Sequence, residues 1–489
     1  MVNANSSFSA SHADPDALRR FLSLNQWLTD TDTLQLPFHA VEHHNRREVR
    51  ELQRLLLQTH LDTRGPGDVG PAISVNGAIF NHRRIRSRSI RTLAGEVQIN
   101  RLAYSRDGSH SIHPLDEALQ IPARSFSYDL QKHLIKAAVQ GPFQESLDRI
   151  FDIAGPKVHK GSLEAIIHEA AVDFDAFYLQ RAVEACEPKS TLLVVAIDGK
   201  GIPLVRPATT QRSVQPSKGP KPGAKKMATV AIVFYRAPWV RTPCQVVDNL
   251  FRSCQRTTYS DSPPRPEQKR VWASLKKCKD EVFQEVFEEV RRRDPESAKT
   301  LVALTDGERV LQTLVTKKLK GLKVTLILDL LHVMGYVWEA GHALCPGDHL
   351  QAELCARLAC SRILEGDVAQ VVKGFRQSAT KRRMLDSDRQ ALLKAANYFD
   401  NNKKHMLYNE YLALGLPIAS GPVEGACKTL IKDRMERSGM RWTEEMAEAI
   451  VRLRAVYLSG DFDSYWSFHI TQEQARLYPK GRWHPVVAK

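Results

Sequence analysis

The sequence lacks the features that mark secreted, membrane-spanning or zinc-binding proteins. None of its eight cysteines forms a C-x-x-C pair, which argues against a zinc ribbon or a redox motif and predicts reduced thiols. No apolar run is long enough to span a bilayer. The first residues, MVNANSSFSASHADPDAL, lack the basic-then-apolar order of a signal peptide. We therefore expect a cytoplasmic protein without a membrane partner.

Acidic residues are also scarce relative to basic ones. The 489 residues include 70 Lys and Arg but 55 Asp and Glu, so the net charge is +15. Such an excess favours a polyanionic partner, most simply nucleic acid. General solubility would explain the total charge but not its clustering along the chain. At about 150 residues per domain, the length predicts about three domains.

Two stretches of the chain place an aspartate directly after a run that is typical of a buried strand. Residues 191–200 read TLLVVAIDGK, and residues 300–312 read TLVALTDGERVLQ. The apolar and β-branched residues predict strands that end at Asp198 and Asp306. Asp-Gly is also a common turn pair, so Asp198 taken alone is better explained as a turn residue.

A third acid lies in a stretch with a helical pattern. Residues 416–439 predict a helix that carries Glu424 in its first turns and ends at Gly439. Because Glu424, Asp198 and Asp306 are far apart in the sequence, only the fold can bring them together. Two strand-end aspartates and a helical glutamate are the groups that a two-metal phosphoryl-transfer site needs. Their hard oxygen atoms suit Mg²⁺ or Mn²⁺ rather than zinc.

The order of the predicted elements indicates the fold class that would carry these acids. Strands are predicted over residues 191–197, 227–235, 240–247, 301–305 and 323–328, with helices over residues 267–293 and 310–320. Three strands, a helix and then strand–helix–strand is the order of an α/β core of ribonuclease-H-like type. The following residues, 336–409, have a helical pattern throughout, which predicts an all-helical insertion before Glu424.

Basic residues gather in a stretch with the pattern of a β-hairpin. The alternating runs SIRTL and EVQINRLAY are joined at Ala94-Gly95. A solvated charged face would explain these charges, but the density of arginines and the scarcity of acids favour contact with DNA phosphates. The arginines of this stretch that we expect to bind DNA are Arg83, Arg84, Arg86, Arg88 and Arg91.

Next to the hairpin in sequence, residues 125–178 predict three helices, and a Gly-bearing turn joins the last two. Ser162 fits as the N-cap of the third helix. Helix, short turn and helix is the outline of a helix-turn-helix, although any three-helix bundle gives a similar pattern. We interpret the hairpin and these helices together as a mainly helical DNA-binding region.

Two further basic groups lie close to the acids in sequence. Residues 206–226 are rich in Pro, Gly and Lys, which predicts a mobile loop after Asp198 that either clamps DNA or is a plain flexible insert. A second group follows Glu424 on its predicted helix. The members of the two groups that we expect to bind DNA are Lys221, Lys225, Lys226, Lys428, Lys432 and Arg434.

Asp329 and His332 form a D-x-x-H unit directly after the last predicted strand. Asp329 fits two roles, the N-cap of the following helix or a metal ligand. His332 is either a packed helical residue or a second ligand. The residues alone support both interpretations.

Several long strings of the sequence are similar to a known family. They are PLDEALQIP, DFDAFY, VVAIDGKGIPLVRP, KKMATVAIVF, RPEQKRVWASL, VALTDGE, LDLLHVMGYVWEA, GLPIASGPVEGACKTLIKDRMERSGMRW and GDFDSYWSFHITQEQ. In this order they resemble bacterial insertion-sequence transposases of the ISKra type, relatives of the Mutator-like DDE transposases. The resemblance covers most of the chain from about residue 114 onward. It implies a ribonuclease-H-like catalytic domain with an all-helical insertion before the last acid.

The resemblance also implies roles for single residues. Asp198, Asp306 and Glu424 match the three acids of the DDE site, which would hold two Mg²⁺ or Mn²⁺ ions. Asp329 and His332 are similar to the C/D-x-x-H signature that follows the second acid. Spacing does not separate Asp306 from Asp329 as that second acid, because each ends a predicted strand. We prefer Asp306 because it follows the fourth strand.

A transposase of this kind binds the terminal inverted repeats of its element and catalyses DNA cleavage and strand transfer. The resemblance therefore implies double-stranded DNA as the partner, both element ends and target, and a homo-oligomer that is at least a dimer. It also implies a bacterial cytoplasm, with the protein on the nucleoid when bound to DNA. The alternatives are an inactive DNA-binding regulator and a ribonuclease-H-like nuclease without strand transfer. Inverted repeats that closely flank the gene would favour transposition.

These expectations divide the chain into five segments. They are an N-terminal helical and partly disordered region (1–70), the basic hairpin and helical DNA-binding domain (71–185), the first part of the catalytic core (190–331), the helical insertion (332–415), and the completion of the core with the C-terminal tail (416–489).

Overall fold

The computed structural model describes residues 15–183, 192–205, 225–251, 263–319 and 321–486. The chain forms two compact units. Unit 1 consists of Met1–Phe177 and Asp463–Lys489, and unit 2 consists of Tyr178–Phe462. None of the helices within the described ranges is both long and apolar enough to cross a membrane.

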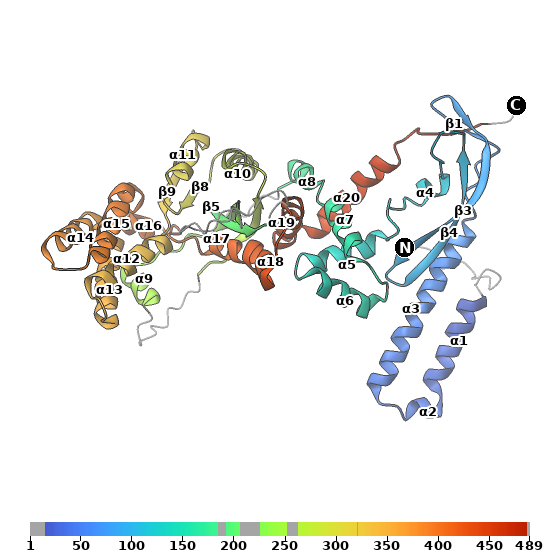
Figure 1. The fold of residues 1–489 in the computed structure, drawn as a ribbon, viewed down its shortest axis with the longest axis horizontal. Helices are drawn as coiled ribbons and strands as arrows, with labels where there is room; N and C mark the ends of the chain where they lie inside the picture. Colours follow the sequence, from blue (N-terminus) through green and yellow to red (C-terminus); the bar gives the residue numbers. More distant parts are fainter. Residues whose placement is uncertain (1–14, 184–191, 206–224, 252–262, 320, 487–489) are drawn as a thin grey trace, which may run out of the picture. The chain divides into compact units, whose positions relative to one another are not determined.

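Unit 1 combines an N-terminal helical hairpin, short sheets and a group of helices (Figure 1). Its helices are α1 (Pro15–Thr29), α2 (Thr31–Leu34), α3 (Phe38–Thr63), α4 (Pro114–Ala118), α5 (Tyr128–Ala138), α6 (Phe143–Ala154), α7 (Lys160–Ala170) and, across the division between the units, α8 (Phe174–Gln180). Its strands are β1 (Ile73–Val75), β2 (Ala78–Phe80), β3 (His82–Thr92), β4 (Gly95–Ser105) and β10 (His484–Pro485). β1 pairs with both β2 and β10, so the C-terminal stretch joins a sheet formed early in the chain.

The predicted β-hairpin is confirmed, and it is longer than its two alternating runs. β3 pairs antiparallel with β4 from His82 opposite Ser105 to Thr92 opposite Gly95. Gly95 has a φ of 139°, and a Cβ there would lie 3.0 Å from Cδ of Arg54, so the turn favours glycine. Alternate residues of the hairpin pack with α4 in a small core formed by Ile90, Val97, Ile99 and Leu115.

The helices predicted over residues 125–178 are present as α5, α6 and α7, followed by α8. The assignment of Ser162 as an N-cap is wrong, because α7 already begins at Lys160 with His159 in the capping position. Gly155 ends α6 with a φ of 83°, a left-handed conformation that reverses the chain at once. Only five residues, 155–159, separate the two helices, and α7 begins two residues before Ser162.

Unit 2 is built around a five-stranded mixed sheet with the strand order β7-β6-β5-β8-β9. β5 (Leu192–Pro203) pairs antiparallel with β6 (Lys225–Arg236), which pairs antiparallel with β7 (Glu267–Ser274). On its other side β5 pairs parallel with β8 (Thr300–Thr305), and β8 pairs parallel with β9 (Val324–Leu328). Apolar runs in β5 and β6 are buried, as expected for central strands. The prediction of a mixed α/β core is confirmed.

Helices form the rest of unit 2. Between the strands are α9 (Pro243–Leu250), α10 (Lys279–Arg293) and α11 (Arg309–Lys318). After β9 the chain is helical through α12 (Leu330–Leu344), α13 (His349–Leu364), α14 (Val368–Lys381), α15 (Asp386–Asn402) and α16 (Tyr408–Ala413), in agreement with the predicted helical stretch. Next come α17 (Gly421–Ala426), a π-helical turn (Cys427–Lys432), α18 (Asp433–Met435) and α19 (Glu444–Leu458). The last helix, α20 (Phe462–Leu477), belongs to unit 1 except for its first residue. Glu424 lies in the first turn of α17, as predicted, and the last helical turn of this segment ends at Gly439 with a φ of 69°.

Two of the predicted elements are wrong. Residues 240–247 do not form a strand, because Thr242 and Gln245 make a capping box that starts α9 at Pro243. The third strand is instead β7, which lies in the stretch predicted as one long helix over residues 267–293. The charged residues in β7 do not fit the pattern of a buried strand. Its Arg270 can be buried because it pairs with an acid of α10.

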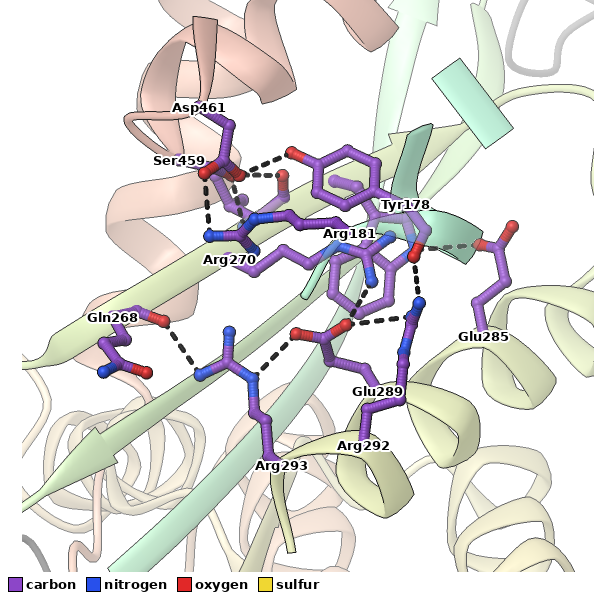
Figure 2. A network of polar contacts seen from close by, with 12 residues as sticks. Tyr178, Arg181, Gln268, Arg270, Glu285, Glu289, Arg292, Arg293, Ser459 and Asp461 are labelled. Atoms are coloured by element: carbon purple, nitrogen blue, oxygen red, sulfur yellow. Dashed lines mark hydrogen bonds and ion pairs between the residues drawn. The ribbon is translucent and has the colours of Figure 1, made fainter. Parts of the chain in front are cut away.

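Figure 2 shows the polar network that joins β7 to α10. Glu289 of α10 is only 1% exposed and accepts hydrogen bonds from Arg270 and from Nε of Arg293, the latter at 2.7 Å. The Arg270 guanidinium lies 3.8 Å from the ring centroid of Tyr178, whose hydroxyl donates to Asp461 at 3.0 Å. The first and last segments of unit 2 are thereby attached to one buried group of charges.

Candidate functional site

Three of the candidate acids lie where neighbouring strands of the unit 2 sheet end their pairing. β5 continues past Asp198, so this residue does not begin a turn, and the turn interpretation is wrong. Parallel pairing of β5 with β8 stops at Ala196, two residues before Asp198. Asp306 follows β8 directly, and Asp329 follows β9 directly. Because these three parallel strands are neighbours, their carboxyl ends lie at the same edge of the sheet.

Asp198 is connected to the segment that carries Glu424. Its Oδ1 accepts the backbone N–H of Gly199 at 2.6 Å, and its Oδ2 accepts the thiol of Cys427 at 3.2 Å. Cys427 lies three residues after Glu424, in the π-helical turn that continues α17. Burial raises the pKa of the Cys427 thiol, and the charge of Asp198 raises it further, so the thiol stays a neutral donor. This contact fixes the glutamate-bearing helix against β5.

Asp306 is held by its own turn and by the helical stretch. Its Oδ1 accepts the backbone N–H of Glu308 at 2.9 Å, and the Tyr398 hydroxyl of α15 donates to its backbone carbonyl at 2.6 Å. Gly307 has a φ of 91°, and a Cβ there would lie 2.9 Å from the Tyr398 hydroxyl. A glycine is therefore required for this turn to approach α15.

Asp329 is 1% exposed, and four protein donors already use its two oxygens. Oδ1 accepts the backbone N–H groups of Leu331 and Ser420, both at 3.0 Å. Oδ2 faces Nδ1 of His332 at 3.0 Å and accepts the Ser420 hydroxyl. Burial opposes its charge, but these hydrogen bonds outweigh burial and lower the pKa of Asp329. Its interpretation as a helix N-cap is confirmed, and it also ties the end of β9 to the segment before α17.

His332 and Glu424 complete the group. Ligand atoms of Asp329, His332 and Glu424 all lie within 4.8 Å of one another. The bond to Asp329 raises the pKa of His332, and the charges of Asp306 and Asp198 act in the same direction. Burial raises the pKa of Glu424, and the charges of Asp329 and Asp198 raise it further, against the effect of His332. The pKa values of His332 and Glu424 therefore both respond to the charges of nearby aspartates.

The donor atoms at this site fit a hard divalent cation such as Mg²⁺ or Mn²⁺. If only distances are considered, Asp329, His332 and Glu424 are the residues that could share a metal ion. A carboxylate can accept about four hydrogen bonds, and Asp329 already faces four protein donors. Because this leaves no lone pair for a metal ion, we consider Asp329 a positioning residue. Asp198 and Asp306 accept fewer hydrogen bonds and so keep more lone pairs for a metal ion. Oδ2 of Asp306 accepts no hydrogen bond from any described residue.

The Ser420 hydroxyl should matter for stability because it satisfies a buried carboxylate. Replacing Ser420 by alanine is expected to lower the free energy of unfolding by about 1.5–3 kcal/mol, as for a lost hydrogen bond to a charged group. Urea unfolding checks this value. Ser361→Ala is the matched control, because the Ser361 hydroxyl bonds the exposed Glu365 on the surface of α13 and its loss should change little. Equal free energies of unfolding for the two variants would contradict the idea that the bonds between Asp329 and Ser420 act as a clamp, here called the Asp329–Ser420 clamp.

Sequence reasoning missed three residues that build the site: Ser420, Cys427 and Tyr398. Ser420 directly precedes a Gly-Pro pair that starts a helix, which is a recognisable capping signal. Cys427 lies on the same helical segment as Glu424, but nothing in the sequence shows that it faces β5. Tyr398 has no local signal at all, because it reaches Asp306 only through the packing of α15.

The hairpin arginines predicted to bind DNA fall into two classes. Arg84 and Arg86 are exposed on β3, and no described residue pairs with either. Arg83 pairs with Asp68 and is partly exposed. Arg88 donates to the carbonyls of residues 122, 123 and 124, and Arg91 donates to that of residue 157 at 2.8 Å, so these two guanidinium groups hold the fold. Only the exposed arginines keep the full capacity to bind phosphates.

The basic residues of unit 2 that were predicted to bind DNA also differ in their surroundings. Lys221 lies outside the described residues. Lys225 and Lys226 belong to β6 rather than to a loop, and they pair with Glu436 and Glu444, each at 2.6 Å. Lys428 and Lys432 are exposed. The expectation for Arg434 is corrected, because its side chain is buried with its guanidinium 4.7 Å from the Trp442 ring centroid.

Comparison with known proteins adds little to this picture. No family model matches the sequence, and no curated protein matches it. Among solved structures, the Drosophila P element transposase strand transfer complex is similar at a TM-score of 0.35 and 10% identity, over 67% of this chain and 91% of that chain. An overlap this loose carries no argument about function, which has to rest on the residues themselves.

Proposed function

We propose that this chain is a DDE transposase, which binds the terminal inverted repeats of an insertion sequence and catalyses metal-dependent DNA cleavage and strand transfer. One observation carries the proposal. Asp198 lies on β5 just after its parallel pairing with β8 stops, and Asp306 directly follows β8, so both lie at one sheet edge. The Cys427–Asp198 bond brings the helix of Glu424 to the same edge. The sequence resemblance described above is consistent with the same conclusion.

The topology of the sheet supports a ribonuclease-H-like core. In order of appearance the strands lie in the order 3-2-1-4-5, the first three antiparallel and the last two parallel to the first. This is the arrangement expected for that fold, with the first acid on the first strand and the second acid after the fourth. Glu424 returns to the sheet after the helices α12–α16.

Asp198, Asp306 and Glu424 are the residues that would hold Mg²⁺ or Mn²⁺. When bound, such cations polarise a phosphodiester and lower the pKa of water or of a hydroxyl group. The protein contributes position: the sheet fixes the two aspartates, and the Asp329–Ser420 clamp fixes the start of the helix that carries Glu424. Positioning and neutralisation of phosphate charge are the main demands of phosphoryl transfer, and no covalent protein intermediate is needed.

The alternatives explain less. A DNA-binding regulator accounts for the charge of +15 but gains nothing from an acidic cluster that repels phosphate. A nuclease without strand transfer would use the same acids. An assay with a pre-cut, labelled repeat end and a target plasmid separates the two activities. We expect the labelled 3′-end to become joined to the plasmid, and a product that is only shortened would favour the nuclease.

The exposed hairpin arginines should contribute to DNA affinity through phosphate contacts. The double variant Arg84→Ala/Arg86→Ala is expected to lower the slope of log K against log salt by about 2, close to 0.9 for each contact. Fluorescence anisotropy on repeat DNA at several salt concentrations measures the slope. Arg389→Ala, an exposed arginine of the helical stretch, is the matched control. An unchanged slope in the double variant would remove the hairpin from the DNA interface.

A further inference from the structure

The N-terminal helices form an antiparallel hairpin that buries little of its own apolar surface. α1 contacts α3 through the ion pair of Arg20 with Glu48 and through the rings of Trp27 and His44, whose centroids are 3.9 Å apart. α3 is 26 residues long and has no buried residue, although it includes the run LQRLLLQ. In Figure 1 the α2 end of this hairpin projects away from β3 and β4. Helices of this length need a packed face to be stable.

The exposed apolar residues of both helices are regularly spaced. On α3, Phe38, Val49 and Leu56 are 11 and 7 residues apart, so they lie within about 20° of one line along the helix. On α1, the spacing of three and four residues puts Leu18, Phe21 and Leu22 on one face. All six are exposed, Phe38 the most at 80%. Such stripes are typical of helices that pack against a further helix.

The exposed apolar area matches what a stable interface requires. Nine large apolar side chains between residues 18 and 57 are 39% to 80% exposed. At about 150–200 Å² for a fully exposed side chain they present roughly 700–1,000 Å², close to the 800 Å² or so that each partner contributes to an interface of standard size. Monomeric proteins rarely expose this much apolar surface in one region. The nine side chains are Leu18, Phe21, Leu22, Leu34, Leu36, Phe38, Val49, Leu56 and Leu57.

The charges of these helices point to a protein partner. α1 and α3 together carry six Arg and five Asp or Glu, in contrast to the arginine-rich strand β3. A nearly balanced surface with a leucine and phenylalanine stripe does not fit DNA phosphates or an anionic lipid surface. Mixed charges around an apolar stripe are self-complementary under twofold symmetry, the commonest symmetry of soluble oligomers.

We propose that the α1–α3 hairpin is the interface between two copies of this chain. Two hairpins packed against each other form a four-helix arrangement that buries the stripes of both helices. The inference does not depend on catalysis, although two copies would also supply one site for each of two DNA ends. It assigns the interface to unit 1.

The oligomeric state of the full chain in the absence of DNA tests this proposal. Sedimentation equilibrium at micromolar concentration should give twice the chain mass of 55.2 kDa for the wild type. Leu22→Glu and Leu56→Glu should each shift the protein to the monomer, with unchanged helical content by circular dichroism, because both side chains are already exposed in one copy. High salt should not dissociate the wild type, since apolar contacts are not screened.

Leu350→Glu is the matched control, because Leu350 of α13 is 76% exposed but belongs to unit 2. It should leave the dimer intact. A monomeric wild type overturns the proposal. A dimer that persists in Leu22→Glu and Leu56→Glu also overturns it and places the interface elsewhere. None of these outcomes bears on DNA cleavage, so this proposal and the proposed function fail separately.

Discussion

Replacing Asp198 by asparagine should abolish metal-dependent DNA cleavage while DNA binding survives. Asparagine has the same shape, and its one oxygen can still accept the Cys427 thiol at the cost of the bond from the Gly199 N–H, so the tie between β5 and the Glu424 helix should remain. What is lost is a negative charge that would hold a divalent cation, worth several kcal/mol at the transition state, or roughly a 10³-fold fall in rate. The measurement is the rate of strand cleavage on labelled repeat DNA with Mg²⁺.

The same loss is expected for Asp306→Asn and Glu424→Gln, whereas the positioning residue Asp329 should behave differently. Outer residues that orient ligands usually change activity by about 10–100-fold. Asp329→Asn should therefore weaken cleavage without removing it. Asp386→Asn is the matched control, because Asp386 is an exposed aspartate in the first turn of α15. Near-normal cleavage by Asp198→Asn, or complete loss only in Asp329→Asn, would show that the ligands are assigned incorrectly.

Replacing Glu289 by alanine should cause a large loss of stability. Glu289 is the common acceptor of Arg270 and Arg293, and all three side chains are almost fully buried. Removal of the acid leaves two buried cations without their counter-charge, which typically costs about 3–5 kcal/mol. Urea unfolding of the full chain measures the change. Glu288→Ala is the matched control, since the neighbouring Glu288 is only half-buried and accepts a single hydrogen bond from the described residues, that of Gln284.

The same network predicts how stability depends on pH. Burial alone would raise the pKa of Glu289, but the charges of Arg270 and Arg293 outweigh burial and lower it to about 2. A depressed pKa in the folded state stabilises the protein above the unfolded value of 4.5, and this contribution is lost as the pH falls from there towards 2. Glu289→Ala should therefore destabilise strongly at pH 7, and its difference from wild type should shrink in acid. A difference that stays constant down to pH 3 would contradict this account.

Much of the site could be predicted because its parts have local signals. Apolar runs that end near Asp198 and Asp306 identify two strands, and neighbouring strands in a parallel pair must place their ends together. Glu424 could be placed on a helix from its spacing. The order of the elements also gave the class of the core, and the long helical stretch before Glu424 followed from its periodicity.

The parts that escaped prediction depend on contacts between distant residues. β7 looks helical because Arg270 lies in its middle, and only Glu289 on another element makes a buried arginine tolerable there. Asp198 lies within a strand because β6 extends the pairing that β8 ends, and the length of β6 is not visible from β5. The role of Asp329 depends on Ser420, 91 residues later in the chain. Spacing could not separate Asp306 from Asp329, and our preference for Asp306 as a ligand rests on the hydrogen bonds that Asp329 already accepts.

The most direct test of the central claim is cleavage of DNA that contains the repeats flanking the gene. Wild-type protein is incubated with end-labelled DNA in Mg²⁺, in Mn²⁺ and in EDTA, beside the Asp198→Asn variant. We predict a cut at the repeat boundary that leaves a 3′-hydroxyl, requires a divalent cation and is absent in the variant. Tight binding of the repeats without any cut in Mg²⁺ or Mn²⁺ would contradict the account and favour a DNA-binding regulator.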